Sequence, residues 1–367
     1  LALGLVLLAM LAAIPVVWIE TGCVAPRAAP ATNFQSVLPA ADRRDEVNSY
    51  LTYPEWSIVH AYEDLAGVMR RGSESDYGYF GAIRRYWSSL CGITEMASRR
   101  GAITRDYKVM LHVIGLSFAA ELGIKGIYEN SIGALTAWVR GSTRTPEDEF
   151  ALALADDYAA FLRQTPWYEY PFGGKLLQFW RDVPMSGGNM VRKIERRFAL
   201  TLEWGTKAIY AKVLALGAAA SPAPLRIKSV VKDLAASDVA ADRRIKIVQV
   251  LDGGGAIVET DRYRTLTEIM QGLAARGRNF SEIAGNQNIL MTVLAPDGKT
   301  VLPGGTSLLF EGPVGARPGW RRLALDVGVP GSPTRWLVDV GFGDAALHPV
   351  PIPVGSAPTE SFGRPPG

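Results

Sequence analysis

Two stretches of this chain repeat each other without a gap. Residues 52–87 align with residues 145–180 at one constant offset, and the Glu-x-Gly-x-Lys block of residues 121–125 recurs at residues 203–207. In each half, the aligned stretch comes first and the Glu-x-Gly-x-Lys block follows it. Such self-similarity predicts a duplicated structural unit. The identical pairs of the gapless alignment are Thr52/Thr145, Asp64/Asp157, Ala66/Ala159, Arg70/Arg163, Tyr77/Tyr170, Gly81/Gly174 and Trp87/Trp180.

Each copy has the pattern of three helices. Thr52 with Glu55, and Thr145 with Asp148, have the spacing of capping boxes, in which a hydroxyl and a carboxylate satisfy backbone N–H groups at the start of a helix. The third and longest helix of each copy carries the Glu-x-Gly-x-Lys block. The predicted repeats cover residues 51–140 and 141–221.

Composition limits the function. The chain has 367 residues, of which 48% are hydrophobic, enough for two or three packed domains. Its net charge of +3 comes from interspersed acids and bases, so no basic stripe exists and we exclude nucleic acid as a partner. Cys23 and Cys91 make no disulfide framework, and the three histidines lack metal-ligand spacing, so we expect no metal and no cofactor. The histidines are His60, His112 and His348.

The first 19 residues form an apolar run long enough to span a bilayer. Trp18 lies near its end, where an interfacial aromatic residue belongs. We predict a single-pass anchor over residues 1–19, with a cleaved signal peptide as the alternative. The remainder is expected on the extracytoplasmic side of the cell membrane. Residues 20–50 are predicted to form a linker, because most of this stretch is rich in Ala, Pro and small polar residues.

Residues 109–127 are apolar enough to suggest a second span, although they include His112, Glu121 and Lys125. Basic residues precede both third helices, so two spans here would share one orientation and would need another crossing between them. The intervening sequence has no further apolar run of adequate length. We therefore expect buried core helices in preference to intramembrane helices.

Both Glu-x-Gly-x-Lys blocks place a glutamate four residues before a lysine. The simpler interpretation is two solvated helix faces, where such a pair contributes about 0.2–0.5 kcal/mol. However, Gly123 and Gly205 lie inside these helices, where glycine costs about 0.5–1 kcal/mol relative to alanine. We therefore hypothesise that the third helices cross at these glycines about a pseudo-two-fold axis, which joins both ion pairs in one polar cluster. The candidate binding residues are Glu121, Lys125, Glu203 and Lys207.

The pattern changes beyond the second repeat. Alternating apolar residues at 244–251, a Gly-rich turn and a second apolar run predict a β-hairpin. Helical periodicity follows at residues 263–276, and residues 289–294 return to the pattern of a strand. The glycines at 253–255 lack a following Lys-Ser/Thr, so we interpret them as a hairpin turn and not as a phosphate loop. Residues 225–300 are therefore predicted to form an α+β module.

Near the end of the chain, Arg-Leu-Ala-Leu-Asp-Val at residues 322–327 precedes Trp-Leu-Val-Asp-Val-Gly-Phe-Gly-Asp at 336–344 and His-Pro-Val-Pro-Ile at 348–352. These segments resemble arylamine N-acetyltransferases, over about residues 320–352 only. The resemblance implies a Cys–His–Asp triad that transfers an acetyl group from acetyl-CoA to an arylamine or hydrazine. Asp339 matches the aspartate of that triad.

The other two triad members are missing. Arg322 stands where the family has its histidine, and a guanidinium stays protonated and cannot accept the proton of a thiol. The chain has no cysteine after Cys91, which we interpret as a core or helix-end thiol. Asp339 alone cannot run acetyl transfer. We expect residues 301–367 to form a β-hairpin-like segment and a Pro/Gly-rich tail.

These observations predict a mainly α-helical fold with a C-terminal α+β module, in which a transmembrane helix precedes a duplicated three-helix unit. The expected function is that of a membrane-anchored, non-catalytic binding or scaffold protein with a protein or small-molecule partner. The alternative is an incomplete or degenerate acyltransferase similar to arylamine N-acetyltransferases.

Overall fold

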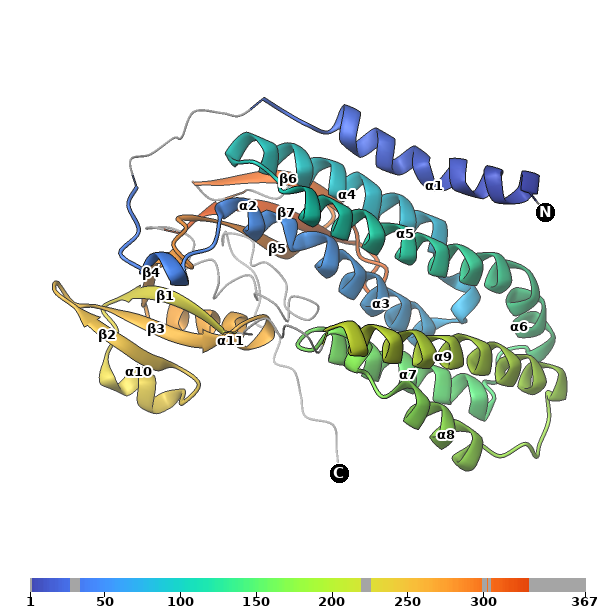
Figure 1. Ribbon diagram of the computed structural model, residues 1–367. Coiled ribbons are helices and arrows are strands. Elements are labelled where there is room, and N and C mark those ends of the chain that lie inside the picture. Colours follow the sequence, from blue (N-terminus) through green and yellow to red (C-terminus); the bar gives the residue numbers. More distant parts are fainter. Residues whose placement is uncertain (1, 27–33, 219–225, 299–301, 303–304, 330–367) are drawn as a thin grey trace.

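The computed structural model describes the chain apart from residues 1, 27–33, 219–225, 299–301, 303–304 and 330–367, and Figure 1 shows a bundle of long helices followed by β-sheets. A mainly helical fold with a C-terminal sheet module is thus confirmed. The helices of the bundle are α1 (Ala2–Gly22), α2 (Glu46–Leu51), α3 (Tyr53–Arg71), α4 (Tyr79–Arg100), α5 (Arg105–Tyr128), α6 (Ala134–Arg140), α7 (Pro146–Leu162), α8 (Phe172–Asp182) and α9 (Met190–Ala218).

Local sequence explains where α7 begins. The Asp148 backbone N–H donates to the Thr145 hydroxyl (3.2 Å), and the Thr145 N–H donates to the Asp148 carboxylate (3.0 Å). This is the predicted capping box, which satisfies N–H groups that have no partner within the helix. The capping box predicted at Thr52 and Glu55 is wrong, because Thr52 already has helical backbone angles (φ −76°, ψ −17°) between α2 and α3.

The helix starts follow the offset of the sequence repeat. α3 and α7 begin at Tyr53 and Pro146, and α4 and α8 begin at Tyr79 and Phe172, both at the offset of the gapless alignment. α3 packs directly on α7. The copies differ in length, since α4 has 22 residues and α8 has 11. Each of the two aligned stretches contains a helix, a short turn and a second helix, and a longer helix follows each stretch.

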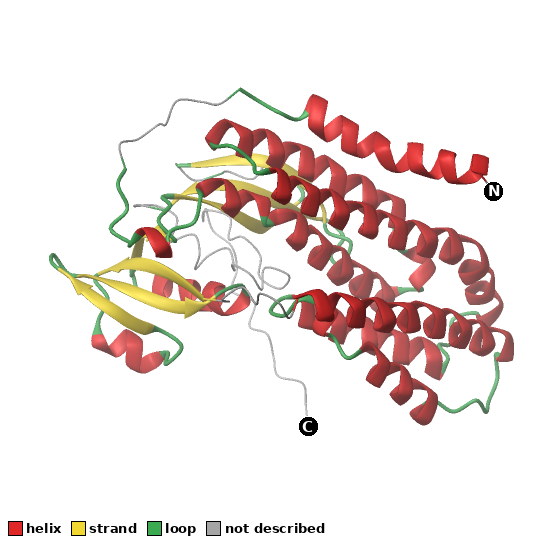
Figure 2. Ribbon diagram, in the orientation of Figure 1, coloured by secondary structure: helices red, strands yellow, loops and turns green. Residues whose placement is uncertain are grey.

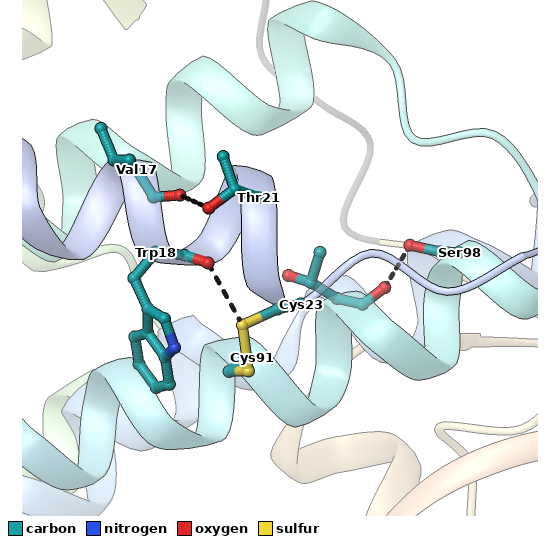
Figure 3. Close-up of a disulfide and its surroundings, with 7 residues drawn as sticks. Val17, Trp18, Thr21, Cys23, Cys91 and Ser98 are labelled. Atoms are coloured by element: carbon teal, nitrogen blue, oxygen red, sulfur yellow. Dashed lines mark hydrogen bonds between the residues drawn. A yellow bond between two sulfur atoms is a disulfide. The ribbon is translucent and has the colours of Figure 1, made fainter.

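α1 is fixed to the bundle at its C-terminal end. Cys23 forms a disulfide with Cys91 of α4, as Figure 3 shows. Glu20 pairs with Lys108 (2.6 Å) and His112 (2.9 Å) at the start of α5. The interpretation of Cys91 as a free thiol is therefore wrong, because α1 folds back along α4, a tertiary contact that the cysteine spacing did not reveal. The residues after α1 consequently do not act as the sole connection between α1 and the bundle.

α5 continues through a π-helical turn (Glu129–Gly133) into α6. Arg105–Arg140 is the one helical stretch in the described part of the chain that is long and apolar enough to cross a membrane; the apolar stretch Ala12–Gly22 is shorter. The 18-residue apolar window of the longer stretch has a mean hydropathy of 1.4, and 28% of that window is buried. We predicted a buried core helix, and in the structure α5 is buried on one side only.

Two antiparallel sheets follow the bundle, and in Figure 2 the first sheet lies apart from the long helices, whereas the second lies beside them. The first sheet has the order β2-β3-β1-β4 and contains the predicted hairpin. Two helices, α10 (Ala236–Ala241) and α11 (Arg264–Ala275), belong to this region, and α11 is the helix that the sequence predicted. The strands are β1 (Arg226–Lys232), β2 (Lys246–Leu251), β3 (Gly255–Asp261) and β4 (Asn279–Ile283).

The second sheet has the order β5-β7-β6 and comprises β5 (Asn288–Pro296), β6 (Thr306–Pro313) and β7 (Trp320–Gly328). Because β5 pairs with β7 along its whole length, the predicted boundary near residue 300 falls inside one sheet. This sheet also joins the bundle. The Arg100 guanidinium pairs with Asp326 (2.6 Å), and the Tyr50 hydroxyl donates to the same carboxylate (2.7 Å).

Candidate functional site

The structure brings the four predicted binding residues together. Lys125 of α5 pairs with Glu203 of α9 (2.9 Å), and Lys207 of α9 pairs with Glu121 of α5 (2.8 Å). Lys207 also pairs with Glu203 within α9 (3.2 Å). The lysine of each block thus binds the glutamate of the other block, so the two blocks form one polar cluster between α5 and α9.

The two glycines do not mark the crossing of these helices. A Cβ added at Gly123 would have Ile83 of α4 as its neighbour at 4.0 Å, and one added at Gly205 would have Leu176 of α8 at 3.9 Å. The hypothesis of a close backbone approach at these positions is therefore wrong. The contact between α5 and α9 is instead formed by long charged side chains. These side chains span a wider gap than the gap between two helices that pack closely at glycines.

The cluster extends well beyond the predicted residues. Lys125 also pairs with Glu74 (2.6 Å), which pairs with Arg196 (2.7 Å). Arg196 pairs in turn with Glu129 (2.7 Å) and Glu195. Arg196 is 1% exposed, and buried charges are stable only when they are paired and hydrogen-bonded. The polar cluster is therefore a continuous ion-pair network through the interior of the bundle.

Aromatic rings enclose one end of the network. The Lys207 ammonium lies 5.0 Å, 5.1 Å and 5.4 Å from the ring centroids of Tyr62, Tyr158 and Trp204. A cation over aromatic faces is stabilised by the ring quadrupole. The Tyr62 hydroxyl donates to Glu121. These contacts fix the position of Lys207, so the ammonium is held and not free to move to a ligand.

Arg192 connects the network to the start of α7. Its guanidinium pairs with Asp148 (2.8 Å) and Glu195 (3.0 Å), and Arg140 also pairs with Asp148 (2.9 Å). Burial on its own raises the pKa of Asp148, but the two guanidinium groups and the Thr145 N–H stabilise the carboxylate and bring its pKa down to about 2. Asp148 is thus a charged anchor and not a proton carrier near neutral pH.

The free space at the network is small. A cavity of about 20 Å³ lies beside it, lined by Tyr62, Glu74, Lys125, Tyr158, Glu203 and Lys207 among others. A single water needs roughly 10–15 Å³ by this measure, whereas small-molecule sites enclose about 300–1,000 Å³. The geometry therefore admits a water molecule and excludes an organic ligand in this conformation.

A second buried polar group lies where α3 meets α7 and β7. His60 Nδ1 lies 3.2 Å from Glu63, whose other oxygen accepts a hydrogen bond from Arg163 (2.7 Å). Arg322 of β7 pairs with Asp64 (3.4 Å). Burial raises the pKa of Glu63, but His60 and the two arginines outweigh it and lower that pKa to about 2. In the described structure His60 Nε2 is buried without a hydrogen-bond partner, so no hydroxyl or thiol nucleophile is placed for this histidine to activate.

The strand that begins the acetyltransferase-like segment belongs to the fold. β7 is the central strand of its sheet, and Arg322 and Asp326 of this strand form ion pairs with the bundle. Burial lowers the pKa of the Arg322 guanidinium, but Asp64 and Glu63 outweigh it, so Arg322 stays charged and cannot serve as a base. Asp339 and His348 lie outside the described residues.

Sequence reasoning missed Glu74, Glu129, Arg192, Glu195 and Arg196. It treated Arg192 and Arg196 as part of a basic flank that precedes a helix. Their spacing of four residues places them on one face of the helix, with the apolar Ile194 on the opposite face, and this pattern could have indicated a charged inner face. Glu74 gave no such signal, because it lies in a short turn between helices.

The described residues contain no group of three or more His, Cys, Asp or Glu side chains placed to hold a metal ion. No protein-family model, curated protein or solved structure matches this chain. The interpretation of the polar cluster therefore rests on its own geometry.

Proposed function

We propose that this protein is a non-catalytic scaffold that α1 anchors in a membrane, with its sheets on the extracytoplasmic side. The observation that carries this proposal is the disulfide between Cys23 and Cys91, directly after α1. Disulfides persist in oxidising compartments and are rare in the cytosol. The chain that follows α1 therefore belongs outside the cytoplasm. In this proposal the C-terminal end of α1 lies on the extracytoplasmic side of the membrane and its N-terminal end on the cytoplasmic side.

The closed interior supports a scaffold over an enzyme. Each charge of the polar cluster is held by opposite charges, and the neighbouring cavity of about 20 Å³ has room for a water molecule. We therefore propose a protein partner in preference to a small-molecule ligand. In this proposal Glu121, Lys125, Glu203 and Lys207 hold the two halves of the bundle together and do not contact the partner.

Thiol trapping in membranes tests the proposal. Cells that express the full chain are lysed in the presence of a maleimide polymer, and membranes are washed with alkaline carbonate. We expect the protein in the pellet, with polymer attachment only after reduction. Attachment without reductant, or protein in the supernatant, would contradict the proposal. In the Cys91→Ser variant the Cys23 thiol should react without reductant, which shows that the polymer reaches this position.

Acetyl transfer is the competing function. The proposal predicts that the purified full chain does not acetylate a simple arylamine from acetyl-CoA, because Arg322 replaces the base and no cysteine follows Cys91. Turnover by the wild-type chain that disappears in Asp339→Asn would overturn the scaffold proposal in favour of an acyltransferase.

We also infer that residues 51–221 are an internal duplication. Two sets of crossed ion pairs support this: Arg70 with Asp156 and Arg163 with Glu63 obey the offset of the gapless alignment. The pairs of Lys125 and Lys207 cross in the same way between the third helices. An experimental structure in which residues 52–87 do not overlay on residues 145–180 would refute the duplication.

A further inference from the structure

α9 buries most of its charged residues and exposes many of its apolar residues. Arg192 and Arg196 are 2% and 1% exposed, whereas Phe198 and Ile209 are 60% and 70% exposed. Water favours the reverse, because arginine, lysine and glutamate are rarely buried and large apolar patches are rarely left open. Most of the exposed apolar residues lie along one face of α9, among them Val191, Ile194, Phe198, Leu202, Ile209 and Val213.

The adjacent helical stretch has the same inverted polarity. α5 turns Glu121 and Lys125 toward α9 in the polar cluster, while apolar residues of α5, α6 and the π-helical turn between them remain exposed. They are Val109, Met110, Val113, Ile124, Ile127, Ile132, Leu135, Trp138 and Val139. Together with the exposed residues of α9 they form a surface that we name the outer apolar face. Two neighbouring helices thus direct their charges at each other and their apolar side chains outward.

The length of this face fits a lipid bilayer. The exposed residues of α9 run from residue 191 to residue 213, which corresponds to about 33 Å at roughly 1.5 Å per residue. The hydrocarbon core of a bilayer is about 30 Å thick. Among the exposed positions of α9 up to residue 213, Lys212 is the one charged residue, and it lies at the end of the stripe where a long side chain can reach the headgroups.

The surroundings favour lipid over a second protein. Glu20 ties α1 to α5, so the outer apolar face adjoins the helix that we propose as the membrane anchor. A protein interface would have a polar rim around its apolar centre, whereas the outer apolar face adjoins another apolar helix. On α7, by contrast, the exposed positions include Glu149 and Asp157. One side of the bundle is therefore suited to hydrocarbon and another to water.

We propose that the outer apolar face of α5, α6 and α9 lies against lipid acyl chains. This inference rests on the proposed attachment by α1 and goes beyond it, because the bundle itself then contacts the membrane interior. The ion-pair network follows from the same arrangement. Charges cannot face hydrocarbon without a large free-energy cost, so they pair with each other inside the bundle.

Spin labels on the full chain in phosphatidylcholine vesicles test the inference. The native cysteines remain joined in their disulfide, so a nitroxide can be attached to Phe198→Cys or Ile209→Cys alone. Ala153→Cys is the matched control, because Ala153 is an exposed position on α7. Collisions are measured with oxygen, which concentrates in hydrocarbon, and with a nickel chelate, which stays in water.

At Phe198→Cys and Ile209→Cys we expect more collisions with oxygen than with the nickel chelate, and the reverse at Ala153→Cys. Nickel-dominated collisions at the two α9 positions would overturn the inference. Rare collisions with both reagents would also overturn it, because a protein would then cover the face. If the chain enters the vesicles but gives either of these results, α1 still anchors the protein and only the lipid contact of the outer apolar face is refuted. If the chain does not enter the vesicles, the proposed function itself is refuted.

Discussion

The helical bundle and the α+β region that follows it differ in how many charged side chains they bury. In the bundle, Arg192 and Arg196 are buried and Phe198 is exposed, while in the β-sheets the most buried residues are apolar, such as Val293 and Leu325, both 0% exposed. The ion pairs that Glu268 of α11 forms with Arg244 and Arg264 lie near the surface, with these side chains 31–45% exposed. The bundle also has an apolar core, which includes Leu90, Ile93 and Phe172. The difference teaches that one region of a chain can add a buried charged network and an exposed apolar face to an ordinary core, while another region does not.

The stabilising interactions of the two regions differ accordingly. The sheets gain stability from apolar burial, which contributes about 25 cal/mol per Å² of apolar surface removed from water. The centre of the bundle depends on a network in which each charge needs its partners. Substitutions that remove one charge should therefore affect the bundle much more than substitutions of surface charges.

The largest expected effect follows from Arg196→Leu. This change leaves Glu74, Glu129 and Glu195 without their shared cation. Loss of one partner from a buried network costs roughly 3–5 kcal/mol, so denaturant titration should show a loss of that size. Arg99→Leu is the control, because its pair with Glu95 is about half exposed and should contribute about 0–1 kcal/mol. Equal small losses would contradict the comparison between the two regions.

The disulfide should contribute the next largest effect. It joins residues that are 68 positions apart, and removal of such a crosslink costs about 2–4 kcal/mol. In the Cys23→Ser/Cys91→Ser double variant, hydrogen exchange should therefore become faster in α1 and α4, while β1 to β4 keep their protection. Uniform loss of protection across the chain would show that the bundle and the sheets unfold as one unit.

A pH dependence tests the charged interior. Because the folded pKa of Asp148, about 2, is below its ordinary value of 3.8, this carboxylate stabilises the fold above pH ~4 and loses that effect as the pH falls toward 2. The shift corresponds to about 2 kcal/mol. Asp148→Asn should reduce the acid sensitivity of unfolding by this amount, whereas Asp252→Asn at an exposed turn should not. If the free energy of unfolding falls equally with pH in wild type and in Asp148→Asn, the pKa of Asp148 is not lowered to about 2.

The sequence predicted the parts of the fold that depend on local patterns. The Thr145–Asp148 capping box, the hairpin of β2 and β3, and α11 follow from residue types at short spacing. The proximity of the two Glu-x-Gly-x-Lys blocks was anticipated because the repeat suggested symmetry. The contact itself uses side chains of α5 and α9 that lie far apart in the sequence.

Tertiary contacts were not predictable in the same way. The Cys23–Cys91 disulfide depends on α1 folding back along α4, and the role of Arg196 depends on three carboxylates from separate elements. Hydropathy alone could not decide whether apolar residues of α5 face a core or the surface of the bundle, because it does not depend on where a side chain points. Only the structure shows that Val113 and Ile124 are exposed.

The smallest effect distinguishes two glycines of α5. A Cβ at Gly126 would lie 2.7 Å from the Cβ of buried Tyr79, whereas a Cβ at Gly123 would meet only Ile83, at 4.0 Å. Gly126→Ala should therefore destabilise the bundle by about 1–3 kcal/mol through overpacking. Gly123→Ala should stabilise it by about 0.5–1 kcal/mol, because alanine restricts the unfolded chain and favours helix. Thermal melts of both variants measure these changes. If Gly123→Ala also destabilises the bundle, Gly123 is closely packed after all. That result would support the close approach of α5 and α9 at this glycine, which the structure excludes.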